Sequence, residues 1–337
     1  MAPLPTLEDV ASRAGVSTAT VSRCLNSPEK VVDHTREKVM SAVDELGYTP
    51  HFGGRALASR TTNTAGAVIP TMDNAIFACA LQAFQKELAS AGMTLLVASS
   101  DYSPSHEFEQ ICTLVERGAD GLLLIGADRP KTSYDYLDKR GIPYVVAWTN
   151  HSDQAACCVG FDNRLAAKRM AEHVIAHGHR NIAMISGITE GNDRAAERVH
   201  GVRDALADAE INPDAFKVVE VNYSLDAAGR AFDKLITTSP PPTAVVCGND
   251  VLAAGAVTRA KARGLRVPKD ISIVGFDDIE LASVIEPKLT TVHVPHRRMG
   301  VAAAKCLLDM RELERTIPGR EFMTEIIERE SLGPVNR

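Results

Sequence analysis

The sequence predicts a small all-α unit at the N-terminus, followed by a larger α/β unit built on parallel sheets. In the first 46 residues, apolar side chains recur every three or four positions, which is the spacing of amphipathic helices. From about residue 65, short apolar runs alternate with amphipathic stretches, as they do in repeated strand–helix units. A length of 337 residues with 45% apolar content suits more than one domain.

The first helix of the N-terminal unit is expected over residues 7–14. Thr6 and Asp9 stand at its start with a spacing close to that of a capping box. Gly15 supplies the left-handed conformation that commonly ends a helix. Two more helices follow, and the last of them is expected at about residues 34–46.

The second helix is expected to run from Ser17, which can cap it, to about Leu25. Two short helices joined by a glycine turn fit a helix-turn-helix, whose second helix enters the DNA major groove. Four side chains are left on its outer face: Thr18, Ala19, Ser22 and Arg23. Small side chains let the helix approach the groove floor, and Arg23 can pair bidentately with guanine. The alternative is a helical hairpin that only packs.

Residues 10–26 read V-A-x-x-A-G-V-S-x-A-T-V-S-R-x-L-N. This order resembles the DNA-binding signature of the lactose-repressor (LacI/GalR) family of bacterial transcription regulators. The resemblance implies that Thr18, Ala19 and Arg23 contact DNA bases. It also implies phosphate contacts, or a positioning role, for five further residues: Thr6, Ser17, Thr20, Ser22 and Asn26.

The next segment, residues 49–61, resembles the hinge of that family, a short helix that forms on operator DNA. By this resemblance Arg55, Ala56 and Leu57 reach the minor groove, where Leu57 acts as a wedge that kinks the duplex. The alternative is an ordinary linker with one buried leucine. Gly54 stands where the family has alanine, and a helical glycine costs about 1 kcal/mol. We therefore expect the hinge to fold only on DNA.

Charge and composition limit the possible partners. The net charge is −6, and the first 60 residues hold seven basic and seven acidic side chains. DNA binding would therefore depend on local geometry and on two copies acting together. The N-terminal residues lack the pattern of a signal peptide, no apolar run has the length of a membrane span, and the seven cysteines are scattered. We expect a cytoplasmic protein with no membrane partner.

In the larger unit, ten apolar runs are expected to form strands: 65–70, 95–99, 121–125, 144–147, 157–160, 181–186, 218–221, 244–247, 271–275 and 290–294. Amphipathic stretches between most of them are expected to form helices: 79–91, 106–117, 163–177, 195–209, 227–237 and 251–263. About 270 residues are too many for one comfortable sheet, so the pattern predicts two similar lobes with a cleft between them.

The family resemblance continues through residues 177–187, 247–256 and 267–292. It implies a two-lobe effector domain with the periplasmic-binding-protein fold, and a homodimer whose contacts lie near a helix at 295–311. The domains expected are a helix-turn-helix domain at 1–48, a hinge at 49–61, and an effector-binding and dimerisation domain at 62–337. The lobes expected are about 62–161 plus 293–320, and about 162–292 plus 321–331.

In open parallel sheets, a ligand sits beyond the carboxyl ends of the strands. That rule and the family's effector positions give seven candidate effector-binding residues: Asn74, Phe77, Asp128, Trp148, Arg198, Asn249 and Asp277. The same rule adds neighbours: Asp101, Tyr102, Asp162, Asn222, Tyr223 and Asp250. Amides, carboxylates, aromatic faces and a guanidinium suit a sugar or a sugar acid. A purine-type corepressor is the alternative.

Several of these candidates have ordinary structural alternatives. Asp162 and Asp250 are equally suited to capping the helices that follow them. Trp148 can be lobe-interface core instead of a ligand platform, and Arg198 can be a charge on the surface of its helix.

The sequence predicts a DNA-binding transcription regulator, with a repressor favoured, and no enzyme. It contains no phosphate-binding loop of the GxxxxGK[ST] type, no GxGxxG after a strand and no GxSxG elbow. His173 and His177 share a helix face, but no carboxylate completes an H-E-x-x-H pattern, so we expect no metal and no cofactor. The alternatives are a solute-binding protein with associating helices and an architectural DNA binder.

Overall fold

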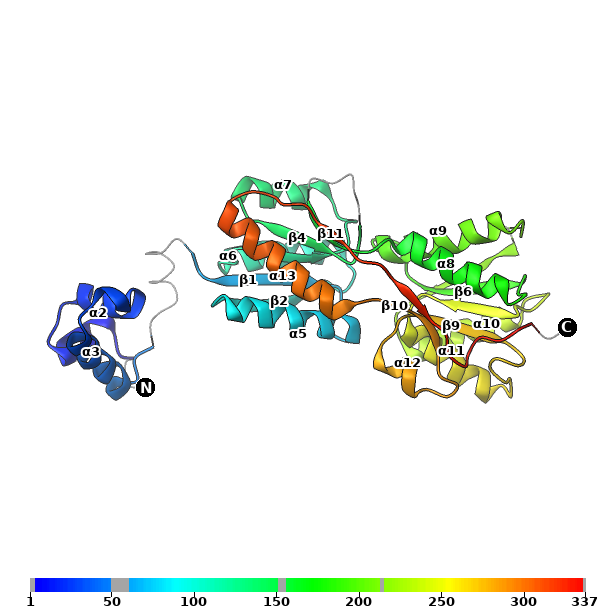
Figure 1. The fold of residues 1–337 in the computed structure, drawn as a ribbon, viewed down its shortest axis with the longest axis horizontal. Coiled ribbons are helices and arrows are strands. Elements are labelled where there is room, and N and C mark those ends of the chain that lie inside the picture. Colours follow the sequence, from blue (N-terminus) through cyan, green and yellow to red (C-terminus); the bar gives the residue numbers. More distant parts are fainter. Residues whose placement is uncertain (1–3, 50–60, 151–155, 213–214, 336–337) are drawn as a thin grey trace. The chain divides into compact units, whose positions relative to one another are not determined.

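The structure is a computed structural model that describes residues 4–49, 61–150, 156–212 and 215–335. It divides into two compact units, Met1–Thr62 and Asn63–Arg337, each with its own hydrophobic core (Figure 1). In the described residues, no helix is both long enough and apolar enough to cross a membrane.

Short helices form the N-terminal unit: α1 (Leu7–Ala14), α2 (Thr18–Asn26), the 3-10 helix η1 (Pro28–Lys30) and α3 (Asp33–Leu46). The predicted capping box is confirmed, because Thr6 and Asp9 exchange hydrogen bonds at the start of α1. These bonds from Thr6 lower the pKa of the Asp9 carboxyl. Gly15 ends α1 with a φ of 69°, in the left-handed region that favours glycine.

Helices α1, α2 and α3 share one small core. Each contributes a fully buried valine: Val10 from α1, Val21 from α2 and Val39 from α3. The side chain of Ser17 caps α2, as the sequence predicted. The outer face of α2 is therefore presented by a helix that is fixed at its start and packed along its inner side.

The described part of the larger unit contains two six-stranded sheets. The first sheet has the order β11-β5-β4-β3-β1-β2, with β1 (Thr64–Ile69), β2 (Thr94–Ser99), β3 (Leu122–Ile125), β4 (Tyr144–Ala147), β5 (Cys157–Gly160) and β11 (Arg320–Glu321). The second has the order β12-β10-β9-β8-β6-β7, with β6 (Ile182–Gly187), β7 (Lys217–Val221), β8 (Ala244–Cys247), β9 (Ser272–Asp277), β10 (Thr290–His293) and β12 (Glu325–Ile327). The neighbouring strands are parallel except for β10 and β12.

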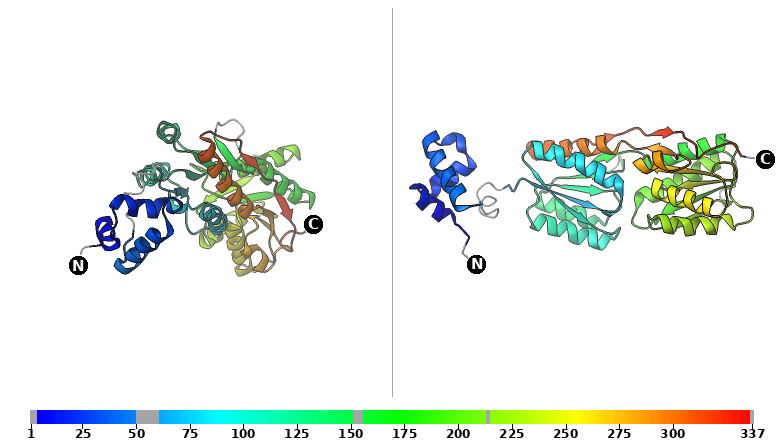
Figure 2. Two further views of the ribbon diagram at one scale, coloured as in Figure 1. Left: turned by 60° about the vertical axis from the view of Figure 1, so that its left-hand side comes forward. Right: turned by 90° about the horizontal axis from the view of Figure 1, so that it is seen from below.

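Helices cover both faces of each sheet (Figures 1 and 2). The first lobe is the first sheet with α5 (Ala75–Ser90), α6 (Pro104–Glu116), α7 (Lys131–Arg140) and α13 (His296–Leu313). The second lobe is the second sheet with α8 (Asn163–Ala176), α9 (Asp193–Asp208), α10 (Leu225–Ile236), α11 (Asp250–Ala262) and α12 (Glu280–Val284).

Strand β3 shows why the buried strands are continuous apolar runs. Leu123 and Ile125 pack into the core under α5 and α13, whereas Leu122 and Leu124 pack with α6 and α7 on the opposite face. Successive strand residues point to opposite faces, so a sheet covered on both sides needs apolar residues throughout. The predicted alternation of strands and helices, and the two-lobe α/β architecture, are confirmed.

The chain passes between the lobes after β5, after β10 and between β11 and β12. The sequence did not predict α7, α12, β11 or β12. Helix α7 has the polar sequence KTSYDYLDKR and buries only Ser133 and Leu137, so its apolar periodicity is weak. Strands β11 and β12 span two and three residues, which is too short for any period to be read.

The close contact between α8 and α9 requires a glycine at position 201. A Cβ atom there would lie 2.0 Å from the carbonyl oxygen of Arg164 and 2.9 Å from the amide nitrogen of Lys168, both on α8. At Gly229 in α10, a Cβ atom would meet only the side chain of Arg259, at an ordinary 3.6 Å.

We predict that Gly201→Ala lowers the free energy of unfolding by about 1–3 kcal/mol, because α8 and α9 must separate. Gly229→Ala is the matched control and should be neutral or stabilising by up to about 1 kcal/mol, since alanine favours helix. Urea unfolding followed by the fluorescence of the single tryptophan measures both. Equal effects of the two substitutions would contradict the tight contact.

Candidate DNA-reading helix and ligand pocket

Helix α2 exposes the side chains that the sequence predicted to contact bases. Thr18, Ala19 and Arg23 are exposed, while Val21 and Cys24 on the opposite face are buried. Arg23 makes no ion pair with any side chain that the structure describes. Its guanidinium is therefore available to a partner outside the chain.

The residues predicted to position phosphates surround that face. Ser17 and Thr20 lie 2.9 Å apart through their hydroxyl oxygens, and the Asn26 amide donates to the Ser22 hydroxyl at 3.3 Å. Thr6 is exposed at the start of α1. The predicted hinge residues Arg55, Ala56 and Leu57 lie outside the described residues.

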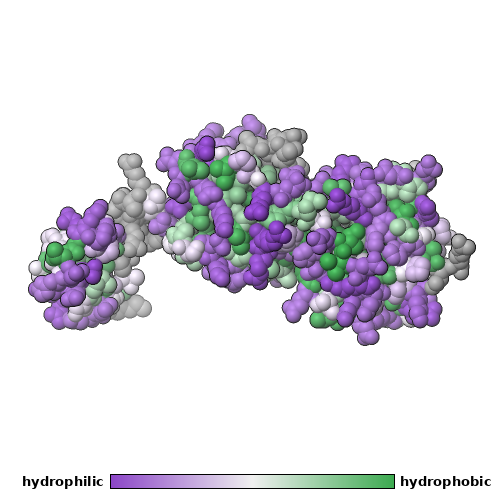
Figure 3. All heavy atoms as spheres, in the orientation of Figure 1, coloured by the Kyte–Doolittle hydropathy of each residue, from purple (hydrophilic) through white to green (hydrophobic). Residues whose placement is uncertain are grey.

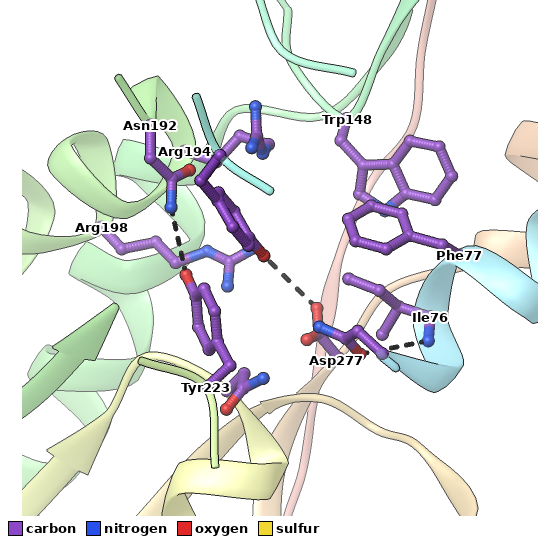
Figure 4. A pocket seen from close by; sticks show the side chains of 11 residues that line it. Ile76, Phe77, Trp148, Asn192, Arg194, Arg198, Tyr223 and Asp277 are labelled. Atoms are coloured by element: carbon purple, nitrogen blue, oxygen red, sulfur yellow. Dashed lines mark hydrogen bonds and ion pairs between the residues drawn. The ribbon is translucent and has the colours of Figure 1, made fainter. Parts of the chain in front are cut away.

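A pocket lies between the lobes of the larger unit, at the carboxyl ends of the strands (Figure 4). Its lining residues come from both lobes: Asn74, Ile76, Phe77, Tyr102, Trp148, Asn192, Arg194, Arg198, Tyr223, Asn249 and Asp277. The enclosed volume is about 20 Å³, which is room for one water molecule. A wider groove of about 770 Å³ adjoins it and shares Asn74, Tyr102, Asn192 and Tyr223.

Arg198 of α9 is buried, with 5% of its surface exposed, so it is not an ordinary surface charge. Its Nε donates to the Asn163 side-chain oxygen at 2.9 Å, and its Nη1 donates to the Gly248 carbonyl at 2.6 Å. The guanidinium carbon also lies 3.8 Å from the ring centre of Phe276. Its Nη2 faces Asp277 at 3.8 Å, which is beyond hydrogen-bond range.

Asp277 ends β9 inside the pocket and is fully buried, with a positive φ of 107°. Its Oδ1 has no hydrogen bond from the described residues, and neither has the Nε2 of His296, which lies 3.8 Å away. Burial raises the pKa of the Asp277 carboxyl to about 7, although the nearby Arg198 lowers it. Burial also lowers the pKa of His296 to about 3. Within the described residues, one carboxyl oxygen of Asp277 in the pocket wall and one ring nitrogen of His296 beside it therefore lack a hydrogen-bond partner.

Trp148 is buried between the lobes and also lines the pocket. Its indole N–H donates to Nδ1 of His296 at 3.2 Å, and its carbonyl accepts from the Asn163 amide at 2.9 Å. Its ring meets that of Phe77 edge to face, with centres 5.4 Å apart. Its position is therefore fixed by segments of both lobes.

Contacts across the cleft also connect the lobes through the start of α9. The Asp193 carboxylate accepts from the Ala127 amide at 2.8 Å, and Arg194 Nη1 donates to the Ile125 carbonyl at 3.2 Å. Ile125 is the last residue of β3, and Ala127 lies in the turn that follows it. At the mouth of the pocket, the rings of Tyr102 and Tyr223 lie 5.8 Å apart, one from each lobe.

The structure brings together six of the seven predicted effector residues: Asn74, Phe77, Trp148, Arg198, Asn249 and Asp277. The seventh, Asp128, is exposed and is not among the residues that line this pocket. The next residue, Arg129, points inward instead and forms two hydrogen bonds with the Glu107 carboxylate. These bonds hold the turn after β3 with Asp128 directed away from the pocket.

Two aspartates were candidates for capping the helices that follow them, and only Asp162 does so. Asp162 caps α8 by accepting from the Leu165 amide at 2.8 Å, as the structural alternative predicted. Asp250 does not cap α11, because Asn249 does so by accepting from the Leu252 amide. Asp250 is fully buried under Gly275 and accepts hydrogen bonds from Thr291 and from the backbone of residue 279.

Sequence reasoning missed three residues that line the pocket: Ile76 on α5, Asn192 directly before α9 and Arg194 on α9. It also missed the buried His296 at the start of α13. The four-residue spacing of Arg194 and Arg198 was a usable signal, because it places both on one helix face. No local pattern marks His296, since it reaches the site from beyond the second passage between the lobes.

Comparison with known proteins decides the family. The HTH-type transcriptional repressor PurR of Vibrio atlanticus (strain LGP32) is 36% identical over 339 aligned residues, which cover 99% of this chain and all of the relative. Residues 6–51 match the bacterial regulatory proteins, lacI family, and residues 171–332 match the periplasmic binding protein-like domain. The chain belongs to the lacI family of bacterial regulatory proteins. It is therefore a DNA-binding transcription regulator with an effector-binding domain.

Solved structures of this class have the same fold. The lac repressor dimer bound to operator and the anti-inducer ONPF is 25% identical, with a TM-score of 0.86 over 98% of this chain and all of that chain. A complex of the transcriptional regulator CelR with cellobiose is 30% identical, with a TM-score of 0.71 over 97% of this chain and 99% of that chain.

The buried carboxyls make stability depend on pH in a defined direction. Burial raises the pKa of Asp250 to about 8 and that of Asp277 to about 7, whereas an aspartate in the unfolded chain titrates near 3.9. Between these values the folded state binds more protons than the unfolded state, so each group makes stability fall as pH rises. His296 has the opposite effect: between its folded pKa of about 3 and its unfolded pKa near 6.5, it makes stability rise as pH rises.

We predict that Asp277→Asn gains stability relative to the wild type as pH rises from 5 to 7, by about 1 kcal/mol per pH unit. Urea unfolding of both proteins at pH 5, 6, 7 and 8 measures this difference. Asp226→Asn, which changes a carboxylate 83% exposed, should show a difference that does not vary with pH. If the stability difference between Asp277→Asn and the wild type also stayed constant from pH 5 to pH 8, the Asp277 carboxyl would be ionised in the folded protein throughout that range.

Proposed function

We propose that this regulator is a repressor that binds a near-palindromic operator as a homodimer in the cytoplasm. A sugar or sugar acid in the pocket between the lobes would set its operator affinity. The observation that carries the effector proposal is the buried pocket, where a guanidinium, a carboxyl group, amides and aromatic rings meet. Hydrogen-bonding groups beside ring faces are the groups that recognise a polyhydroxylated ligand. The cellobiose complex of CelR supports the same class.

The DNA-binding part of the proposal rests on α2. Thr18, Ala19 and Arg23 would read base edges in the major groove, while residues beside them contact phosphates. One unit with balanced charge binds DNA weakly, so two copies in one dimer are needed. The operator-bound dimer of the lac repressor supports this arrangement. When a dimer of this protein binds its operator, Arg55, Ala56 and Leu57 of each chain would contact the minor groove at the centre of the site.

The pocket is well placed to signal to a dimer contact. Asn74 and Phe77 belong to the start of α5, and His296 is the first residue of α13. These two helices pack against each other along the first lobe. Figure 3 shows the face that carries α13, where apolar side chains reach the surface among hydrophilic ones. A ligand that shifts the starts of α5 and α13 would therefore change how two copies meet, and so the spacing of their hinges.

A purine-type corepressor is the second candidate. The rings of Tyr102 and Tyr223, 5.8 Å apart at the pocket mouth, offer flat faces on which a planar base can stack. The two candidates differ in sign, since an inducing sugar would weaken operator binding and a corepressor would strengthen it. By linkage, operator DNA would change the affinity for either ligand by the same factor.

We predict that Arg23→Ala weakens binding to the preferred operator by about 1–3 kcal/mol, because a bidentate base contact is lost. The preference for one base pair should relax, whereas binding to unrelated DNA should change little. Fluorescence anisotropy with an operator selected from random DNA, and with its single-base variants, measures both effects. Arg13→Ala on α1, whose ion pair with Glu45 is internal, should keep the base preference. An unaltered preference in Arg23→Ala would exclude its base-reading role.

We predict that Arg198→Lys lowers effector affinity at least about tenfold, because lysine keeps the charge but loses the fixed planar donors. A thermal-shift screen against sugars, sugar acids, polyols and purines finds the effector, with about 2.7 kcal/mol of stabilisation at a hundredfold excess over Kd. Titration followed by Trp148 fluorescence then compares the variants. Arg164→Lys, at an exposed pair with Asp204, is the matched control. Wild-type affinity in Arg198→Lys would place the ligand elsewhere.

A further inference from the structure

A group of metal-ligating side chains lies in the second lobe, away from the pocket. It comprises His173 on α8, His177 directly after α8, and Glu328 directly after β12. One possible ligand atom from each lies within 4.8 Å of the other two. We call these three residues the α8–β12 cluster. Nothing in the DNA-binding or effector-binding roles uses them.

The fold holds the cluster together although its members are far apart in the sequence. Helix α8 packs against β10, and β12 is the antiparallel neighbour of β10 at the edge of the second sheet. Residues that leave β12 therefore pass close to the end of α8. No carboxylate completes an H-E-x-x-H pattern around the two histidines in the sequence, and the fold instead brings Glu328, directly after β12, to them.

The hydrogen bonding of His177 prepares it to bind a cation. Its Nδ1 lies 2.9 Å from the backbone carbonyl oxygen of His173. A carbonyl only accepts, so Nδ1 carries the hydrogen and the neutral ring keeps its lone pair on Nε2. Metal-binding histidines usually donate their other ring N–H to a carbonyl or a carboxylate in this way.

His173 and Glu328 provide the other two ligand atoms. Nε2 of His173 lies 3.0 Å from Oε2 of Glu328, yet it is buried without a well-formed hydrogen bond to any described residue. Ligand atoms about 2.0–2.1 Å from a tetrahedral zinc ion stand about 3.3 Å apart. The separations in the cluster, 3.0 Å for His173–Glu328 and no more than 4.8 Å for the other pairs, are close to that value. The third nearby histidine, His179, is occupied by Thr243 and the Gly333 carbonyl.

We propose that the α8–β12 cluster binds one divalent transition-metal ion, with Zn²⁺ the best match, through His173, His177 and Glu328. Two imidazoles and one carboxylate suit zinc, whereas Ca²⁺ and Mg²⁺ require mainly oxygen ligands. Three protein ligands leave the fourth position to water. The ion joins the end of α8 to the chain segment that follows the last passage between the lobes, so it stabilises the second lobe.

The test uses the full-length, tag-free protein after chelator treatment and gel filtration. Zn²⁺ is titrated in competition with a chromophoric chelator, and Co²⁺ is added separately to record visible absorption of a tetrahedral site. We expect one Zn²⁺ per chain, a higher Tm with Zn²⁺, and no change in Tm with Mg²⁺. His177→Ala and Glu328→Gln should each lower zinc affinity at least about tenfold and reduce the Co²⁺ absorption.

The matched control is His200→Ala. His200 on α9 forms an exposed pair with Glu197 at 3.3 Å, which resembles the His173–Glu328 pair but is not part of the cluster. The His200→Ala protein should bind zinc with the affinity of the wild type. Glu328 is 58% exposed, so Glu328→Gln leaves the fold intact and isolates the loss of a ligand. Absence of zinc binding by the wild type, or wild-type affinity in both cluster variants, overturns the proposal.

Discussion

A continuous chain of buried hydrogen bonds through the Arg198 guanidinium joins the two lobes. It runs from the Gly248 carbonyl to Arg198, then to the side chain of Asn163, the carbonyl of Trp148 and, through the indole N–H, to His296. Gly248 and Asn163 belong to the second lobe, Trp148 follows β4 of the first, and His296 begins α13. A buried cation depends on hydrogen bonds to offset its desolvation, so these bonds constrain the relative positions of the elements that they join.

The same chain leaves unsatisfied groups that face the pocket. Arg198 Nη2 and His296 Nε2 each lie 3.8 Å from Asp277 Oδ1, and within the described residues neither Asp277 Oδ1 nor His296 Nε2 has a hydrogen bond. Unpaired buried polar groups usually cost free energy, and proteins retain them where a ligand completes the bonding. Hydroxyl groups both donate and accept, so a polyhydroxylated ligand can satisfy the guanidinium, the carboxyl group and the imidazole together. Under the proposed function, binding such a ligand would recover the stability lost by burying these groups.

Much of the fold was predictable because its strands are covered on both faces and read as apolar runs. The pocket was largely predictable because parallel strands align their carboxyl ends, which gathers Asn74, Trp148 and Asp277. Asp128 satisfied the same rule but does not line this pocket, because the Arg129–Glu107 pair holds the turn with Asp128 exposed. His296 and the unexpected β12 depend on where the chain returns between lobes, and no local periodicity encodes that path.

The closed pocket limits how an effector can act. A volume of about 20 Å³ holds one water molecule, so a sugar cannot bind while the cleft keeps this geometry. To admit it, the bonds of Asp193 and Arg194 to the end of β3 and the turn after it must break, or the Tyr102–Tyr223 pair must separate toward the groove of about 770 Å³. A ligand can shift the DNA-binding equilibrium only as far as its affinities for the closed cleft and for an opened cleft differ. The strength of these few contacts across the cleft therefore sets both the ligand affinity and the response of operator binding.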